Sequence, residues 1–341
     1  MSHDQQQISS PAHALAGQFD STAKSPCTRR EFAKWSLAAW PGVGLCSTLG
    51  RLVAAETSLG KPNSKFADVQ VGLNVPYSFA SASMSGDEIL KNCVQLGLSA
   101  VELRTQPVEA FLGAPADLVY PKKSAEAGQS ATQAERLSKW RGSVSMERVQ
   151  EFRKRYEDAG VRIEIVKVDG LFKLTDGELD YVFTLARTLG GRALSTEISN
   201  NHADLKRVGQ FADKHQLMVG YHGHATTKPE HWEKAFSLGK HNGANVDLGH
   251  FVAGNNVSPA GFIQAHHERI THVHVKDRKM HNGPNTPFGE GDTPIVEVLR
   301  LIRDNHWNIQ ATIEFEYKIP AGSDRLTELA RTIKYCRDAL T

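Results

Sequence analysis

The sequence predicts a single (β/α)8 barrel, and three features support that prediction. Short apolar runs typical of strands alternate along the chain with longer stretches of helical periodicity. Several of these runs end in acidic side chains or histidines, as expected at the carboxyl-terminal mouth of a barrel, where the strand ends meet. The length of 341 residues leaves room for one barrel of about 250 residues and an amino-terminal leader.

An export signal is predicted ahead of the barrel. Arg29 and Arg30 precede Phe32 and Lys34, and paired arginines before a bulky apolar residue resemble the twin-arginine signal. The apolar run at 35–49 is interrupted by proline and glycine and is shorter than a membrane-spanning helix requires. We therefore expect the twin-arginine export machinery to be a partner of the chain, and the protein to be exported, into the periplasm.

The boundaries of the chain's parts follow from this signal. The small residues at 53–55 resemble a cleavage site for a signal peptide. We expect residues 1–55 to be the signal peptide, residues 56–67 to be a linker, and residues 68–341 to form the barrel. No second domain is predicted.

Eight strand–helix units can be counted in the barrel region. The strands are predicted from runs of β-branched and other apolar residues, and the helices from apolar residues at helical spacing. Ser85 or Asp87 caps the first helix, and Gly160 ends a later one. The expected strands are 69–75, 100–103, 161–168, 192–198, 217–222, 244–248, 271–276 and 309–315. The helices expected after the first are 145–159, 176–189, 203–215, 229–238, 259–267, 293–305 and 323–340.

A long insertion is predicted at about 105–143. This stretch is rich in Ala, Pro, Gly, Ser and Lys. A loop of such length inside a compact domain is usually functional or mobile. We interpret it as a lid over the mouth of the barrel that contains short helices.

Charge and cysteine content exclude two classes of protein. The formal net charge of the chain is +2, and without the leader the numbers of basic and acidic residues are equal. A neutral domain lacks the basic surface that nucleic acids require, so no nucleic-acid partner is expected. Outside the leader only Cys93 and Cys336 remain, which is too few for a disulfide framework.

The expected strand at 271–276 carries the first sign of a functional site. His272, His274 and Lys276 alternate with apolar residues and therefore share one face of the strand. Two imidazoles and an ammonium are unfavourable on a buried face unless they are paired or bind a ligand. This face is therefore predicted to carry chemistry rather than packing alone.

Other strand ends supply further ligand groups. A set of carboxylates and imidazoles without thiolates is typical of Mn²⁺, Mg²⁺, Co²⁺ or Zn²⁺ bound through oxygen and nitrogen. We therefore predict one divalent metal ion at the mouth of the barrel. The candidate ligands are Glu197, His222, Asp247, His274 and Glu314.

These segments resemble the xylose isomerase-like TIM barrels, the sugar phosphate isomerase/epimerase superfamily, and the resemblance covers residues 68–341. In that superfamily one metal is held by Glu, Asp, His and Glu from strands five to eight. The motifs that carry the resemblance are Tyr221-His222-Gly223-His224, Val246-Asp247-Leu248-Gly249-His250 with Ala253-Gly254, His272-Val273-His274-Val275-Lys276-Asp277, Phe288-Gly289-Glu290-Gly291-Asp292 and Ile313-Glu314-Phe315-Glu316.

The resemblance implies a ligand set with one departure. Asp247, His274 and Glu314 match the last three ligand positions. The fifth strand offers His222 where a glutamate is usual, and its Tyr-His-x-His form is more similar to the inosose dehydratase branch. The fourth ligand is therefore either His222 or Glu197 from the neighbouring strand.

The implied reaction is removal of a proton beside a carbonyl, through an enediolate that the metal stabilises. Glu197 or Glu316 is the expected base, and His222 or His224 is the expected second acid or base. His250 and Lys276 are expected to contact substrate hydroxyls or an oxyanion.

Structural roles are open for several of these residues. Glu316 would also suit the support of a ligand histidine, and Lys276 could simply pair with Asp277 or Glu316. Asp277 and Arg278 could serve only to anchor a loop, and the segment 288–292 is interpreted as a capped loop without direct chemistry. Glu102, at the end of the second strand, is either part of the site or a solvated rim charge.

The function expected from these features is isomerisation or epimerisation of a ketose or keto-sugar by an exported enzyme. A lyase or dehydratase acting on a 3-keto-glycoside or an inosose-like compound is the alternative, and a non-catalytic sugar-binding barrel is the third possibility. A small-molecule sugar is the expected partner. The related apurinic-site endonucleases need additional histidines at the ends of strands two and three, where this chain has Glu102 and Val168-Asp169.

Overall fold

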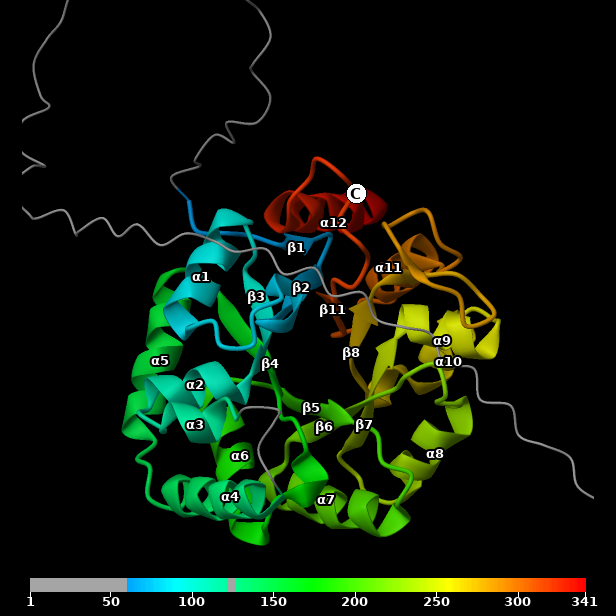
Figure 1. Cartoon of the computed structure of the whole chain (residues 1–341). Helices are drawn as coiled ribbons and strands as arrows, with labels where there is room; N and C mark the ends of the chain where they lie inside the picture. Colours follow the sequence, from blue (N-terminus) through cyan, green and yellow to red (C-terminus); the bar gives the residue numbers. More distant parts are fainter. Residues whose placement is uncertain (1–59, 122–126) are drawn as a thin grey trace, which may run out of the picture. The chain divides into compact units, whose positions relative to one another are not determined.

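The computed structural model describes residues 60–121 and 127–341 (Figure 1). The predicted signal peptide at 1–55 lies outside the described residues, as do residues 56–59 of the predicted linker. Lys65 and Phe66, at the end of that linker, form the short strand β1 (Lys65–Phe66), which pairs antiparallel with β2.

Eight parallel strands form a closed barrel, so the predicted fold class is confirmed. Each strand pairs with the next along the chain, and the last strand returns to the first. Every predicted strand corresponds to one in the structure. The barrel strands are β2 (Val69–Val75), β3 (Ala100–Arg104), β4 (Arg162–Lys167), β5 (Ala193–Glu197), β6 (Met218–His222), β7 (Asn242–Asp247), β8 (Ile270–Val275) and β11 (Gln310–Ile313).

Helices surround the barrel on its outside, as Figure 1 shows. Their apolar faces cover the strands; α11, for example, buries Ile295, Val298, Leu299 and Ile302 at the spacing of one helix face. Among the described residues no helix is long and apolar enough to cross a membrane. Outside the connection between β3 and β4, the described α-helices are α1 (Gly86–Gln95), α6 (Asp176–Leu189), α7 (His202–His215), α8 (Pro229–Ser237), α9 (Leu248–Asn255), α10 (Ala260–His266), α11 (Ile295–Asp304) and α12 (Arg325–Leu340). Both α9 and α10 lie between β7 and β8.

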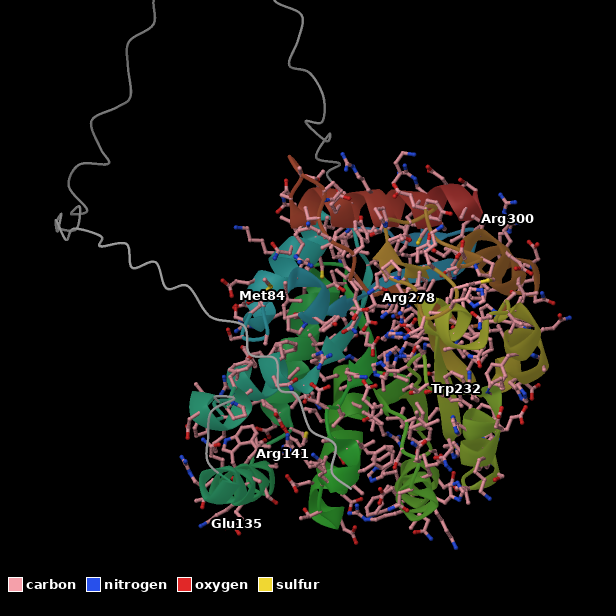
Figure 2. The ribbon with its side chains drawn as sticks, turned by 45° about the vertical axis from the view of Figure 1, so that its right-hand side comes forward. Met84, Glu135, Arg141, Trp232, Arg278 and Arg300 are labelled. Carbon is pink, nitrogen blue, oxygen red and sulfur yellow. The ribbon has the colours of Figure 1, made fainter. Side chains whose placement is uncertain are left out.

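The connection between β3 and β4 contains most of the stretch that was expected to be an insertion. It holds α2 (Thr105–Phe111), α3 (Ala116–Val119) and α4 (Ala127–Arg141), before α5 (Glu147–Asp158) leads to β4. Arg141, labelled in Figure 2, fastens α4 to the barrel: its guanidinium lies 2.7 Å from Glu109 of α2 and 3.0 Å from Glu178 of α6. Nearly all of this arginine is buried, so the two carboxylates replace the water that it loses.

A short helix, α9, begins directly after β7, where the sequence predicted only a connection. Asp247 is both the last residue of β7 and the N-cap of α9, and its carboxylate accepts a hydrogen bond of 2.7 Å from the His250 N–H. The cap therefore holds Asp247 in a fixed orientation at the mouth of the barrel. It also directs His250 toward the same mouth.

Close packing at Gly254 brings two of the predicted site segments together. Gly254 lies near the end of α9, and an added Cβ there would stand 1.8 Å from the carbonyl oxygen of Ala225. Ala225 belongs to the loop after β6 that carries His224. Glycine at 254 therefore allows this loop to approach α9, and the rings of His224 and His250 lie 4.8 Å apart as a result.

We predict that Gly254→Ala destabilises the barrel by about 2–3 kcal/mol, because the loop backbone must move to make room for the methyl group. Chemical denaturation measures the change. Gly261→Ala on α10 is the matched control: nothing lies within 4 Å of its added Cβ, and a better helix former replaces glycine there. Equal stabilities of the two variants would contradict the packing argument.

Candidate metal centre

Four buried ligand groups meet at the carboxyl-terminal ends of β6, β7 and β8 and just beyond β11. Each offers a nitrogen or oxygen atom, and these atoms all lie within 4.8 Å of one another. Strand register brings them together, because Asp247 of β7 pairs with His274 of β8. We call this set the metal group; its members are His222, Asp247, His274 and Glu314.

Two atoms of the metal group face each other without a hydrogen bond, although one of them, Oδ2 of Asp247, lies 3.1 Å from Nζ of Lys276. The Nδ1 atom of His274 and the Oδ2 atom of Asp247 are buried and accept or donate no hydrogen bond within the described part of the chain. They lie 3.8 Å apart, and the same Nδ1 atom lies 3.4 Å from Oε1 of Glu314. Unpaired buried polar atoms are unfavourable, and a cation between them would satisfy both.

Glu102 supports His274 from behind. Its Oε2 atom lies 2.6 Å from Nε2 of His274 and 3.4 Å from Nε2 of His272. A metal-binding histidine commonly gives its second nitrogen to a carboxylate, which leaves the first nitrogen directed at the metal. Glu102 is fully buried, so the interpretation as a solvated rim charge is wrong.

The buried charges of this region favour a divalent cation. Three buried carboxylates (Glu102, Asp247 and Glu314) stand against one buried ammonium, Lys276. With the imidazoles neutral, three negative charges and one positive charge leave a formal excess of two negative charges. Burial raises the pKa of Asp247 to about 6, and Glu314 contributes to the rise. An ion of charge two would restore neutrality.

The same imbalance affects His274. Burial alone lowers the pKa of its imidazole, but the carboxylates of Glu102 and Glu314 outweigh burial and raise the pKa to about 10. His274 is therefore protonated at neutral pH when no metal is bound. A metal ion would have to displace that proton from the ring.

Lys276 lies at the centre of the carboxylates. Its Nζ atom lies 2.6 Å from Glu314, 2.6 Å from Glu316 and 3.1 Å from Asp247. The predicted pairing with Glu316 is therefore present. Asp277 points elsewhere: its carboxylate accepts hydrogen bonds from the backbone N–H groups of Gly289, Gly291 and Thr293, and so anchors the loop of residues 288–292.

Glu197 lies apart from the metal group. Its carboxylate lies 2.7 Å from Nζ of Lys167 and 2.6 Å from Nε2 of His224. In the described chain it belongs to no cluster of potential ligand atoms, whereas His222 does. The structure thus brings His222, and not Glu197, to the position of the fourth ligand.

Two further imidazoles line the mouth of the barrel above His222. The hydrogen bond to Glu197 raises the pKa of His224, whose side chain is more than half exposed. Burial and the neighbouring Lys276 lower the pKa of His250 to about 3. His250 accepts a hydrogen bond of 2.7 Å from Arg278, labelled in Figure 2. The site therefore presents one imidazole whose protonated form is favoured, His224, and one that is neutral, His250.

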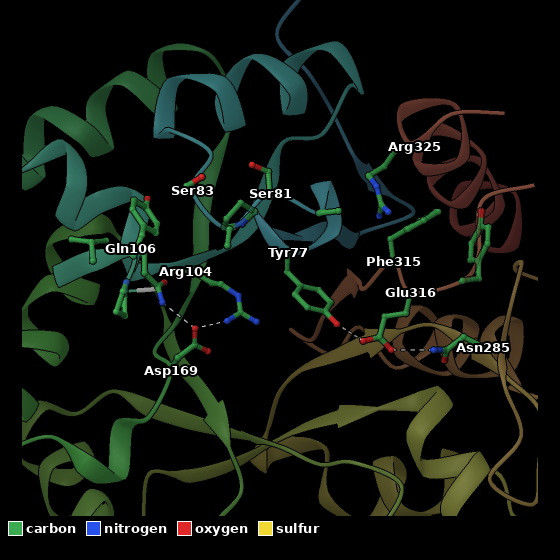
Figure 3. Close-up of a pocket in the computed structure, with 17 residues that line it drawn as sticks. Tyr77, Ser81, Ser83, Arg104, Gln106, Asp169, Asn285, Phe315, Glu316 and Arg325 are labelled. Atoms are coloured by element: carbon green, nitrogen blue, oxygen red, sulfur yellow. Dashed lines mark hydrogen bonds and ion pairs between the residues drawn. The ribbon is translucent and has the colours of Figure 1, made fainter. Parts of the chain in front are cut away.

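Sequence reasoning missed the residues that surround Glu316. Tyr77 donates a hydrogen bond of 2.5 Å to this carboxylate, and Asn285 donates one of 3.2 Å. Figure 3 shows both bonds. Tyr77 follows β2, and Asn285 belongs to β10 (Asn285–Thr286), which pairs with β9 (Asp277–Arg278). The polar segment that follows β2, the first strand of the barrel, could have indicated that Tyr77 belongs to the site.

Comparison with known proteins agrees with this geometry. Residues 180–339, which include all four members of the metal group, match the family described as Xylose isomerase-like TIM barrel. The matched segment runs from α6 to α12 and covers slightly less than half of the chain. No curated protein sequence matches the chain.

Several solved structures share the fold of this barrel. The 3-keto-D-glucoside 4-epimerase from E. coli superposes with a TM-score of 0.54 at 12% identity, covering 79% of this chain and 99% of its own. The "probable 3-DHS dehydratase AsbF" from Bacillus anthracis gives 0.53 at 14% identity, with 78% and 98% covered. A xylose isomerase-like protein from Mycobacterium smegmatis in complex with magnesium gives 0.51 at 14%, with 80% and 97% covered. At these identities the likeness concerns the fold.

We predict that Glu102→Gln lowers the pKa of His274 in the metal-free protein by about 2 units or more, since the opposing carboxylate is lost while burial remains. A histidine NMR titration measures this value. Glu164→Gln is the control, because Glu164 pairs with Arg192, 3.1 Å away, and has no contact with His274. An unchanged titration in Glu102→Gln would show that Glu102 does not set the charge of His274.

Proposed function

We propose that this barrel is a divalent-metal-dependent isomerase or epimerase of a ketose or another keto-sugar. The observation that carries the proposal is the buried set of two imidazoles and two carboxylates, with its unpaired atoms and its excess of negative charge. The epimerase and the dehydratase of the same fold are consistent with it.

The donor set fits one ion such as Mn²⁺, Mg²⁺, Co²⁺ or Zn²⁺, held by His222, Asp247, His274 and Glu314. When bound, such an ion would draw electrons from a substrate carbonyl and its neighbouring hydroxyl and so acidify the adjacent C–H bond. Glu102 holds the ring of His274 in place, and Asn74 donates a hydrogen bond of 2.8 Å to Glu314.

Proton transfer requires a group that is ionised and reaches the substrate. Burial raises the pKa of Glu316, but Lys276 outweighs burial and the pKa is lowered, so this carboxylate is ionised at neutral pH. Its side chain is 21% exposed, at the edge of the metal group. We assign Glu316 as the base that removes the proton beside the carbonyl.

His224 stands on the other side of the metal group. It follows β6, whereas Glu316 follows β11, and two strands separate these in the barrel. Because Glu197 favours the protonated form of the His224 imidazole, His224 is suited to return a proton from the side opposite Glu316. A base and an acid on two sides of a planar intermediate are what epimerisation requires.

Elimination is the second candidate. The observation that favours it is the imidazole of His222 in the position of the usual glutamate, next to His224, whose ring lies 4.9 Å away and whose pKa is raised by Glu197. An imidazolium is suited to protonate a departing hydroxyl or glycosidic oxygen. The two reactions share proton removal and differ only in the product.

We predict that the metal-loaded protein exchanges the proton beside the carbonyl of a keto-sugar in deuterated water, and that a chelator abolishes the exchange. NMR follows the exchange and distinguishes an epimer from an elimination product. Asp247→Asn should lower the rate by about 100-fold or more, because one ligand charge is lost. Asp213→Asn, at an exposed carboxylate paired with His241, is the control. A metal-loaded protein that exchanges no keto-sugar would contradict the proposal.

The pH profile tests the role of His224. An acid loses activity when it deprotonates, so the rate should fall at pH values above the ordinary pKa of histidine, with a midpoint above about 6.5. Glu197→Gln removes the bond that raises this pKa and should move the alkaline limb to lower pH. An alkaline limb at the same pH in both proteins would remove His224 from the assignment.

A further inference from the structure

A cavity of about 900 Å³ opens beside the metal group and is not needed for the reacting sugar alone. At about 30 Å³ per water it holds roughly thirty water molecules. It is also at the upper end of the 300–1,000 Å³ typical of pockets that bind drug-sized ligands. Its walls come from the segment after β2, the ends of β3 and β4, and the segment after β11.

The cavity begins one side chain away from the metal group. Glu316 and Tyr77 both line it, and Glu316 contacts Lys276, which in turn contacts Glu314 and Asp247. Figure 3 shows the hydrogen bond between Tyr77 and Glu316, with Arg104, Gln106 and Asp169 on the other side of Tyr77. A sugar that reacts at the metal group would therefore direct one of its substituents into this cavity.

The walls combine flat rings with polar groups. Tyr77 is 41% exposed, and its ring is fixed by the bond to Glu316 on one side and by the guanidinium of Arg104, 5.3 Å from the ring centre. Tyr120, Phe315 and Tyr317 also line the cavity. Such a surface suits the apolar face of a sugar ring, while polar groups bind its hydroxyls.

The polar groups of the cavity are mixed in charge. Arg104 and Arg325 are matched by Asp169 and Glu316, so the lining has no excess of positive charge for a phosphate. Four lining side chains carry a buried polar atom with no hydrogen-bond partner among the described residues: Arg104, Gln106, Tyr120 and Asn285. Hydroxyl groups both donate and accept, so a hydroxylated ligand suits a lining of mixed charge and polarity.

We propose that this cavity is a binding subsite for a second sugar ring, and that the substrate is a neutral keto-disaccharide or a comparable glycoside rather than a free monosaccharide. The inference rests on the proposed function for the position of the reacting sugar. The subsite itself depends only on the cavity and its lining, so it can be tested without catalysis.

Calorimetry on the metal-loaded protein tests the subsite with two compounds that lack a carbonyl, the disaccharide alcohol lactitol and the monosaccharide alcohol sorbitol. Lactitol should bind about 10-fold or more tightly than sorbitol. Asp169→Ala removes the carboxylate that orders Arg104 and Gln106, and it should reduce that preference by about 10-fold. Gln106→Ala should act in the same direction.

The matched control is Asp176→Ala, which removes an exposed aspartate paired with Arg207, 2.6 Å away and outside the cavity lining. It should leave the preference for lactitol unchanged. Equal affinity for lactitol and sorbitol, or a preference insensitive to Asp169→Ala and Gln106→Ala, would overturn the subsite.

Proton exchange separates this outcome from failure of the proposed function. We expect the protein to exchange the proton beside the carbonyl of a keto-disaccharide such as lactulose. The kcat/KM for this exchange should be about 10-fold or more above that for its ketose unit, D-fructose. Exchange of both sugars with equal kcat/KM would overturn the subsite alone. Tight lactitol binding without exchange of any keto-sugar would support the subsite and overturn the catalytic proposal.

Discussion

The buried negative charge at the mouth of the barrel is the constraint on which the rest of the site depends. Carboxylates and imidazoles from four strands are removed from water, and the nearby ammonium of Lys276 balances only part of the charge. Such a group is unfavourable for folding unless a cation completes it. The arrangement is therefore suited to hold a divalent cation.

The surrounding structure fixes the orientation of each ligand. The N-cap of α9 holds Asp247, Glu102 holds His274, and Asn74 holds Glu314. Gly254 allows the loop of His224 to approach α9, so that the rings of His224 and His250 lie close together near the metal group. Rigid strands set the positions of the ligands, whereas the segments that follow the strands set the chemistry and the size of the substrate cavity.

Much of the barrel could be predicted from the sequence because each strand is a short apolar run whose polar end marks the mouth. His222, Asp247, His274 and Glu314 were predicted in this way as candidate ligands, and the structure brings them into one group. The sequence did not decide between His222 and Glu197, because Lys167, which forms an ion pair with Glu197, lies on another strand. Glu102 was ambiguous, since sequence does not show that two histidines face it across the barrel. Short helices were expected where α2 to α4 lie, but their bounds could not be predicted because the composition of this stretch is typical of loops.

Pulsed electron paramagnetic resonance of the protein loaded with Mn²⁺ tests the central claim most directly, because it counts nitrogen atoms bound to the metal. With two imidazoles in the metal group, the spectrum should show two coordinated nitrogens in the natural protein, and one in His222→Ala or in His274→Ala. A spectrum without coordinated nitrogen, or one that neither substitution changes, would contradict a metal held by these side chains.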